Sequence, residues 1–129
     1  MGSRGAFLSV EANDFSFIDG GQHYKSIGVL SNNQNVKVLV QNSRNVKAPE
    51  YSHTQERVYA IVKDGVLKHL AFYDSDHRQS ACVDFCHAHK GIQPHRHEYL
   101  NHGKNALGVY PTDSELSLAK QIRKEFHLK

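Results

Sequence analysis

The chain has 129 residues, of which 39% are hydrophobic and 22% charged, and its formal net charge is +3 when its ten histidines are neutral. This length suits a single domain with a core that needs neither a metal nor disulfides, and the composition is that of a folded chain rather than a disordered one. No run approaches the roughly 18 apolar residues of a membrane span, and no N-terminal signal segment is visible, so no membrane partner is expected. The mild basicity permits an anionic partner such as RNA.

The sequence predicts an N-terminal arm over residues 1–14 and one domain over residues 15–129. Cys82 and Cys86 lie four residues apart in a segment with strand character. In an extended strand their Cα atoms would be roughly 13 Å apart, which is too far for a disulfide. Reduced cysteines indicate the cytoplasm as the site of action.

The first predicted elements are short strands separated by turns. Residues 15–18 form a short apolar segment that ends in the Asp-Gly-Gly turn at 19–21, and residues 24–30 form the next segment. Alternating valines over 36–40 are typical of a half-buried strand, and residues 42–48 form a polar connection or a weak edge strand.

The strongest structural signal is a hairpin. Two apolar runs at 57–63 and 66–73 flank an Asp-Gly dipeptide, which suits a two-residue type I′ turn because both central residues need positive φ. A further turn leads to a third strand at 81–87. The three strands therefore predict an antiparallel meander over about 57–87.

Strand alternation assigns side chains to the two faces of this meander. On the third strand Cys82 and Asp84 share one face, while Val83 and Phe85 share the other. Asp84 could orient a histidine, although an ordinary solvent-facing carboxylate is the preferred interpretation. His69, in the middle of the second strand, is expected to be a cross-strand surface residue.

The C-terminal segment predicts a helix over about 113–128. Thr112 and Glu115 have the spacing of a capping box, in which each side chain bonds the backbone of the other residue. One helical face carries apolar residues, namely Leu116, Ala119, Ile122 and Phe126. The predicted fold class is therefore α+β, a mostly antiparallel sheet covered by one C-terminal helix.

The stretch 86–98 is the main candidate for function. It holds two His-x-His pairs either side of a Lys-Gly turn and a proline, with histidines at His87, His89, His95 and His97. Strand side chains repeat every two residues, so each pair can project to one face, and the turn between them can bring both pairs together. Imidazole serves both proton transfer and metal ligation, so two chemistries must be considered.

In the first chemistry, histidines cleave RNA by general acid–base catalysis. One imidazole removes the 2′-hydroxyl proton, a second protonates the leaving oxygen, and a cation stabilises the charged phosphorane. The candidate catalytic residues are His87, His89, Lys90, His95 and His97. The candidate substrate-binding residues are Arg96, Tyr99, His102 and Lys104.

In the second chemistry, the same four histidines bind zinc. Four nitrogen ligands, or three with an open position, would come from His87, His89, His95 and His97. The carboxylate of Glu98 or Asp84 would orient a ligating ring through its other nitrogen. Spacing alone does not separate the two chemistries. No Cys-x-x-Cys pair, His-Glu-x-x-His helix or phosphate-binding glycine loop is present.

Residues 49–102 resemble a histidine-rich C-terminal domain of phage minor-head (head-morphogenesis) proteins and of bacterial polymorphic toxins. The resemblance is carried mainly by the run His-x-His-Lys-Gly-x-x-Pro-His-x-His-Glu. The matching positions are Asp84, His87, His89, Lys90, Gly91, Pro94, His95, His97 and Glu98. The resemblance implies a phage- or toxin-associated ribonuclease of the small barnase, EndoU and colicin-like type.

The leading hypothesis from the sequence is thus a small, metal-independent endoribonuclease that needs no cofactor. Its partners would be RNA and either an immunity protein or a phage structural protein. The alternative is a non-enzymatic phage or mobile-element protein whose histidine cluster binds zinc as a structural ion. A third possibility is a metal-dependent hydrolase.

Overall fold

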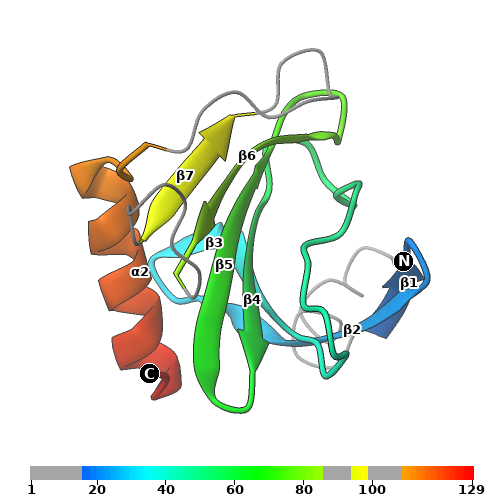
Figure 1. Ribbon diagram of the computed structural model, residues 1–129, viewed down its shortest axis with the longest axis horizontal. Coiled ribbons are helices and arrows are strands. Elements are labelled where there is room, and N and C mark those ends of the chain that lie inside the picture. The colour runs from blue at the N-terminus through cyan, green and yellow to red at the C-terminus, as the bar shows by residue number, and fades with distance from the viewer. Residues whose placement is uncertain (1–15, 86–93, 99–108) are drawn as a thin grey trace.

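The computed structural model describes residues 16–85, 94–98 and 109–129. Seven strands form one sheet in the order β1-β2-β3-β4-β5-β6-β7, and helix α2 lies against it (Figure 1). The elements are β1 (Ser16–Asp19), β2 (Gln22–Leu30), β3 (Asn33–Val40), β4 (Val58–Lys63), β5 (Val66–Tyr73), β6 (Gln79–Asp84), β7 (His95–Glu98) and α2 (Asp113–Phe126). The predicted α+β class, a mostly antiparallel sheet with a C-terminal helix, is confirmed. The predicted arm over 1–14 lies outside the described residues.

One parallel pairing interrupts the otherwise antiparallel sheet. β3 and β4 run parallel, with Val38 opposite Ala60, whereas every other neighbouring pair of described strands is antiparallel. A parallel pair needs a connection that returns to the starting end of the sheet, and residues 41–57 make it. We call residues 41–57 the crossover segment.

The predicted hairpin and its turn are confirmed. β4 and β5 pair antiparallel, and Asp64 and Gly65 between them have φ values of 53° and 75°. Both central residues therefore adopt the left-handed conformation that a type I′ turn requires. The chain continues into β6, which pairs with β5 and completes the predicted meander.

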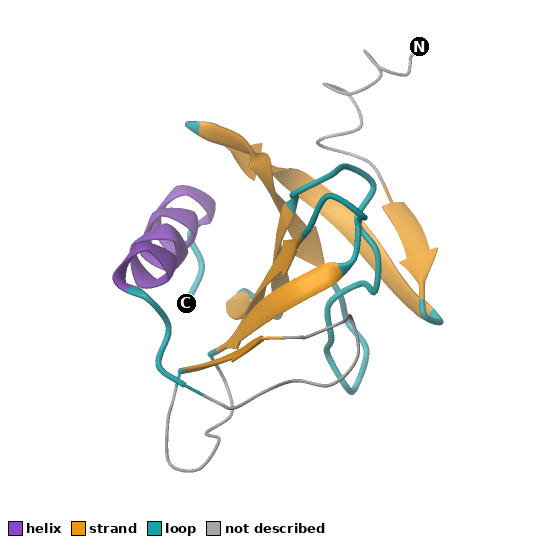
Figure 2. Cartoon of the chain, turned by 90° about the horizontal axis from the view of Figure 1, so that it is seen from above, coloured by secondary structure: helices purple, strands orange, loops and turns teal. Residues whose placement is uncertain are grey.

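The sheet buries a separate apolar cluster on each face. The cluster beneath α2 contains Leu30, Val36, Val38, Ala60, Val62, Leu67, Leu70, Val83, Ala119 and Ile122. The cluster on the opposite face contains Tyr24, Leu39, Ala48, Tyr59, Ile61, Ala71, Tyr73 and Cys82. Figure 2 shows the helix on one side of the sheet and loop segments on the other. The sheet is thus a central layer with the helix on one face and irregular chain on the other.

Helix α2 begins at the predicted capping box. Thr112 Oγ1 accepts from the backbone N–H of Glu115 at 3.2 Å, and the Glu115 carboxylate accepts from the backbone N–H of Thr112 at 2.9 Å. The apolar face is confirmed at Ala119 and Ile122, which are buried, but Leu116 is 40% exposed and does not belong to it. No helix in the described part of the chain has the length and apolar character needed to cross a membrane.

Candidate functional site

Three neighbouring strands present polar side chains on the face opposite α2. In the β5–β6–β7 register His69 lies opposite Asp84, Asp84 lies opposite His95, and Cys82 lies opposite His97. Cys82 belongs to the apolar cluster of that face. Residues directly opposite one another in a sheet project to the same side, so this register gathers the positions on one face. The prediction that Cys82 and Asp84 project to the same face of the sheet is confirmed.

The interpretation of His69 and Asp84 as surface residues is wrong. Their side chains are only 12% and 14% exposed, respectively. His69 points to the same face of the sheet as Ala71 and Tyr73, which are buried on the same strand. This face is buried because the crossover segment covers it. A polar connection carries no local pattern from which such a cover can be predicted.

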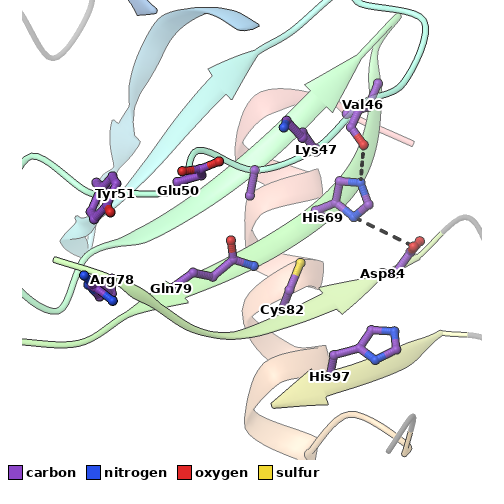
Figure 3. A pocket seen from close by; sticks show the side chains of 11 residues that line it. Val46, Lys47, Glu50, Tyr51, His69, Arg78, Gln79, Cys82, Asp84 and His97 are labelled. Atoms are coloured by element: carbon purple, nitrogen blue, oxygen red, sulfur yellow. Dashed lines mark hydrogen bonds and ion pairs between the residues drawn. The ribbon is translucent and has the colours of Figure 1, made fainter. Parts of the chain in front are cut away.

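These side chains line a pocket with a volume of about 510 Å³. Its floor comes from β5, β6 and β7, and its opposite wall comes from the crossover segment (Figure 3). The lining residues are Val46, Lys47, Ala48, Glu50, Tyr51, His69, Arg78, Gln79, Cys82, Asp84 and His97. The volume falls within the range of roughly 300–1,000 Å³ that small-molecule sites occupy.

His69 joins the floor of the pocket to its wall. Its Nε2 lies 3.2 Å from the backbone carbonyl oxygen of Val46 in the crossover segment. A carbonyl only accepts hydrogen bonds, so Nε2 carries the proton in this contact, and the other ring nitrogen, Nδ1, faces Asp84 Oδ2 at 4.0 Å. The His69 ring thus lines the pocket and links its floor to the Val46 carbonyl of the wall.

Cys82 lies on the floor of the pocket between the histidines. It is a free thiol that is 8% exposed. Burial, and secondarily the nearby Asp84 carboxylate, raises the pKa of the Cys82 thiol to about 12. The thiol therefore stays protonated near neutral pH, which removes Cys82 as a thiolate nucleophile.

Two cations and an aromatic ring complete the pocket lining. Lys47 and Tyr51 come from the crossover segment, and Arg78 immediately precedes β6. Sequence reasoning missed all three, because Lys47 and Tyr51 in the crossover segment and Arg78 in the turn before β6 lie in segments without periodicity. In Figure 3, Tyr51 and Arg78 lie at one end of the pocket, and His69, Asp84 and His97 lie at the other.

Arg96, a predicted substrate-binding residue, lies on the opposite face of the sheet from His97. It is opposite Val83, which is buried beneath α2. Its guanidinium bonds the carboxylates of Glu98 at 2.9 Å and Glu115 at 2.8 Å. These contacts give Arg96 a structural role between β7 and the helix, and we do not include it in the candidate site.

The histidine run is described only in part. His97 lines the pocket, and the backbone of His95 occupies the position opposite Asp84. The other predicted site residues lie outside the described residues, namely His87, His89, Lys90, Tyr99, His102 and Lys104. The four-histidine zinc site includes two of them and stays a prediction; within residues 16–85, 94–98 and 109–129 no group of three or more His, Cys, Asp or Glu side chains is arranged to hold a metal ion.

The chain was compared with models of known protein families, with curated proteins and with solved structures, and none of them matches it.

Proposed function

We propose that the chain is a small ribonuclease-like protein that cleaves RNA by general acid–base catalysis in the pocket over β5, β6 and β7. The observation that carries the proposal is the position of His97. It lines the same pocket as the carboxylate of Asp84 and the cations Lys47 and Arg78. An imidazole for proton transfer and cations for charge stabilisation around one cavity are among the groups that phosphodiester cleavage uses.

The proposed reaction needs two imidazoles on opposite sides of one phosphate. The 2′-hydroxyl oxygen attacks phosphorus and the bond to the 5′ oxygen breaks. One imidazole accepts the hydroxyl proton, and a protonated imidazole donates a proton to the leaving oxygen. The products are a 2′,3′-cyclic phosphate and a free 5′-hydroxyl. Lys47 would offset the charge that builds up on the phosphoryl oxygens.

His97 is proposed as one of the two imidazoles, and the second as one of His87, His89 and His95. Asp84 lines the pocket and lies opposite His95, so the described strands on either side of residues 86–93 meet beside the pocket. This connectivity supports a second histidine from the same run. Lys90 stays a candidate for a further cation.

An assay of RNA cleavage in the presence of a chelator tests the proposal. Wild-type protein should cleave single-stranded RNA and leave cyclic phosphate ends, and His97→Ala should lower the rate roughly 10²- to 10⁴-fold. His23→Ala is the matched control, because His23 is exposed on β2 and does not line the pocket. No cleavage by the wild type, or undiminished cleavage by His97→Ala, would refute the proposal.

A metal measurement on the same preparations addresses the zinc alternative. Stoichiometric zinc that is lost on replacing two of His87, His89, His95 and His97 would favour a structural metal site over acid–base catalysis. A cytoplasmic site of action, and an immunity or phage structural protein as partner, are further proposals that rest on the expectation of reduced cysteines and on the resemblance described above.

A further inference from the structure

Tyr51 is an exposed aromatic residue on a firmly held backbone. Its side chain lines the pocket although the residue is 49% exposed. On one side the Asp19 carboxylate accepts from the backbone N–H groups of Glu50 at 2.8 Å and Tyr51 at 3.3 Å. On the other side Tyr51 forms a backbone bridge with Arg78.

The neighbouring residue adds to this attachment. The backbone N–H of Ser52 donates to the carbonyl oxygen of His77 at 2.8 Å, and His77 Nδ1 lies 2.9 Å from the carbonyl oxygen of Ser52. The backbone around Tyr51 is therefore fixed both to the β1–β2 turn and to the segment that leads into β6. A ring on such a backbone loses little further freedom when it contacts a ligand.

Arg78 enlarges the surface that Tyr51 offers. Its guanidinium carbon lies 5.8 Å from the centre of the Tyr51 ring, within the range of a cation–π contact. The ring and the planar guanidinium meet at the pocket end that lies away from the histidines (Figure 3). Aromatic rings and Arg planes are the surfaces on which unpaired nucleobases stack, and the positive charge favours the adjacent phosphate.

We propose that Tyr51 and Arg78 form a stacking platform for one unpaired nucleobase, which makes single-stranded RNA the substrate class of this pocket. This inference rests on the function proposed above. A base within a duplex has its faces covered by neighbouring base pairs, so only an unpaired base can stack on Tyr51. The platform thus selects single strands by shape rather than by sequence.

The position of the platform determines which nucleotide it contacts. Arg78 immediately precedes β6 and lies four residues before Cys82, the residue opposite His97, which corresponds to roughly 13 Å in an extended chain. The stacked base therefore belongs to a nucleotide other than the one whose 2′-hydroxyl attacks. Platform substitutions should consequently raise KM more than they lower kcat.

Binding to a non-cleavable strand tests the platform apart from catalysis. The probe is a fluorescent 2′-O-methyl RNA, which keeps bases and phosphates but lacks the nucleophilic hydroxyl, and the readout is anisotropy. Tyr51→Ala should weaken binding roughly 5- to 150-fold, the range that base stacking on an aromatic residue implies, and Tyr51→Phe should restore it. Tyr110→Ala is the matched control, since Tyr110 is also exposed but does not line the pocket.

An abasic scan identifies the contact itself. If one base stacks on Tyr51, a strand that lacks that base should bind wild-type protein as weakly as the intact strand binds Tyr51→Ala. Binding of the abasic strand to Tyr51→Ala should be only slightly weaker still. Equal binding of the intact strand to wild type and Tyr51→Ala, or no saturable binding to the wild type, would overturn the platform. Undetectable RNA cleavage together with Tyr51-dependent binding would instead overturn the proposed catalysis and leave the platform standing.

Discussion

Glu115 on α2 accepts a hydrogen bond from Arg96 Nε on β7 at 2.8 Å, while its other carboxylate oxygen accepts from the backbone N–H of Thr112 at 2.9 Å. One side chain therefore both caps the helix and attaches it to the last strand of the sheet order, which carries His97. The side chains of Arg96 and Glu115 are 19% and 11% exposed, so solvent screens this pair only partly.

Replacing Glu115 by Gln should destabilise the protein by about 1 kcal/mol. The amide keeps an oxygen for the capping contact but removes the charge opposite Arg96. A double-mutant cycle with Arg96→Met, followed by denaturant unfolding, should give a coupling of roughly 0.5–1.5 kcal/mol. Glu98→Gln serves as the control, since Glu98 also pairs with Arg96 but its side chain is 56% exposed, and its coupling should be smaller. Equal couplings of Arg96 with Glu115 and with Glu98 would contradict the expectation that the less exposed pair is stronger.

Gly65 should not accept a side chain without cost. Its φ is +75°, and nothing lies within 4 Å of the position that a Cβ would occupy, so the penalty arises from backbone conformation alone. Gly65→Ala should lower the free energy of unfolding by roughly 1 kcal/mol, whereas Asp64→Asn in the same turn should leave it nearly unchanged. Thermal unfolding of both variants checks this expectation, and an unchanged Gly65→Ala would refute the type I′ assignment.

Cys82 should react slowly with thiol reagents in the folded protein. Its pKa of about 12 leaves a very small thiolate fraction near pH 8, and the side chain is 8% exposed. In a Cys86→Ser background, labelling of Cys82 should be at least about 100-fold slower in native buffer than in denaturant. Comparable rates in the two conditions would show that the pocket floor is open to the reagent.

His53 should make stability depend on pH on the acidic side of neutrality. Partial burial lowers the pKa of His53, and the positive charges of Lys37 and Arg57 lower it further; its ring packs edge-on against Phe17 at 4.5 Å. The unfolded chain then binds a proton more readily than the folded one. Stability is therefore retained above the unfolded pKa of about 6.5 and is lost as pH falls from there towards the folded value.

Unfolding midpoints of wild type and His53→Gln at about pH 8 and about pH 5.5 measure this effect, because His53 is neutral in both states only at the higher pH. The difference between the two midpoints should be smaller in the variant. An identical difference in both proteins would exclude His53 as a source of the pH dependence.

Local signals sufficed for the elements of the fold. The Asp64–Gly65 dipeptide and the alternation on either side of it predict β4 and β5, and the Thr112–Glu115 box predicts the start of α2, because these features depend on neighbouring residues. The parallel pairing of β3 with β4 was not predicted. It depends on contacts between distant segments, which propensity and periodicity do not encode.

The same limit applies to the candidate site. The spacing of the histidine run predicted an extended segment for His95 and His97, which β7 shows, and strand alternation placed Cys82 and Asp84 on one face. Lys47 and Tyr51 could not be predicted, because they face the pocket only after the crossover segment has folded over the sheet. Leu116 shows the opposite error, since helical spacing predicted burial where the sheet does not reach it.

The parallel seam between β3 and β4 also suggests an order of folding. The antiparallel pairings of β4, β5 and β6 join segments close in sequence. The parallel pairing of β3 with β4 can form only when the loop made by the crossover segment closes. Loop closure costs entropy before any contact compensates for it, so we expect the seam to form late. Val38→Ala on β3 should mainly speed unfolding, with a φ-value near 0, whereas Leu70→Ala on β5 should slow folding, with a φ-value of roughly 0.5–0.8. The reverse pattern would refute this order.

If the seam forms late, the wall of the pocket is the last part of the molecule to assemble and the first to detach. A ligand that contacts both Tyr51 on the wall and Arg78 beside the floor would then lengthen the lifetime of the native state without accelerating its formation.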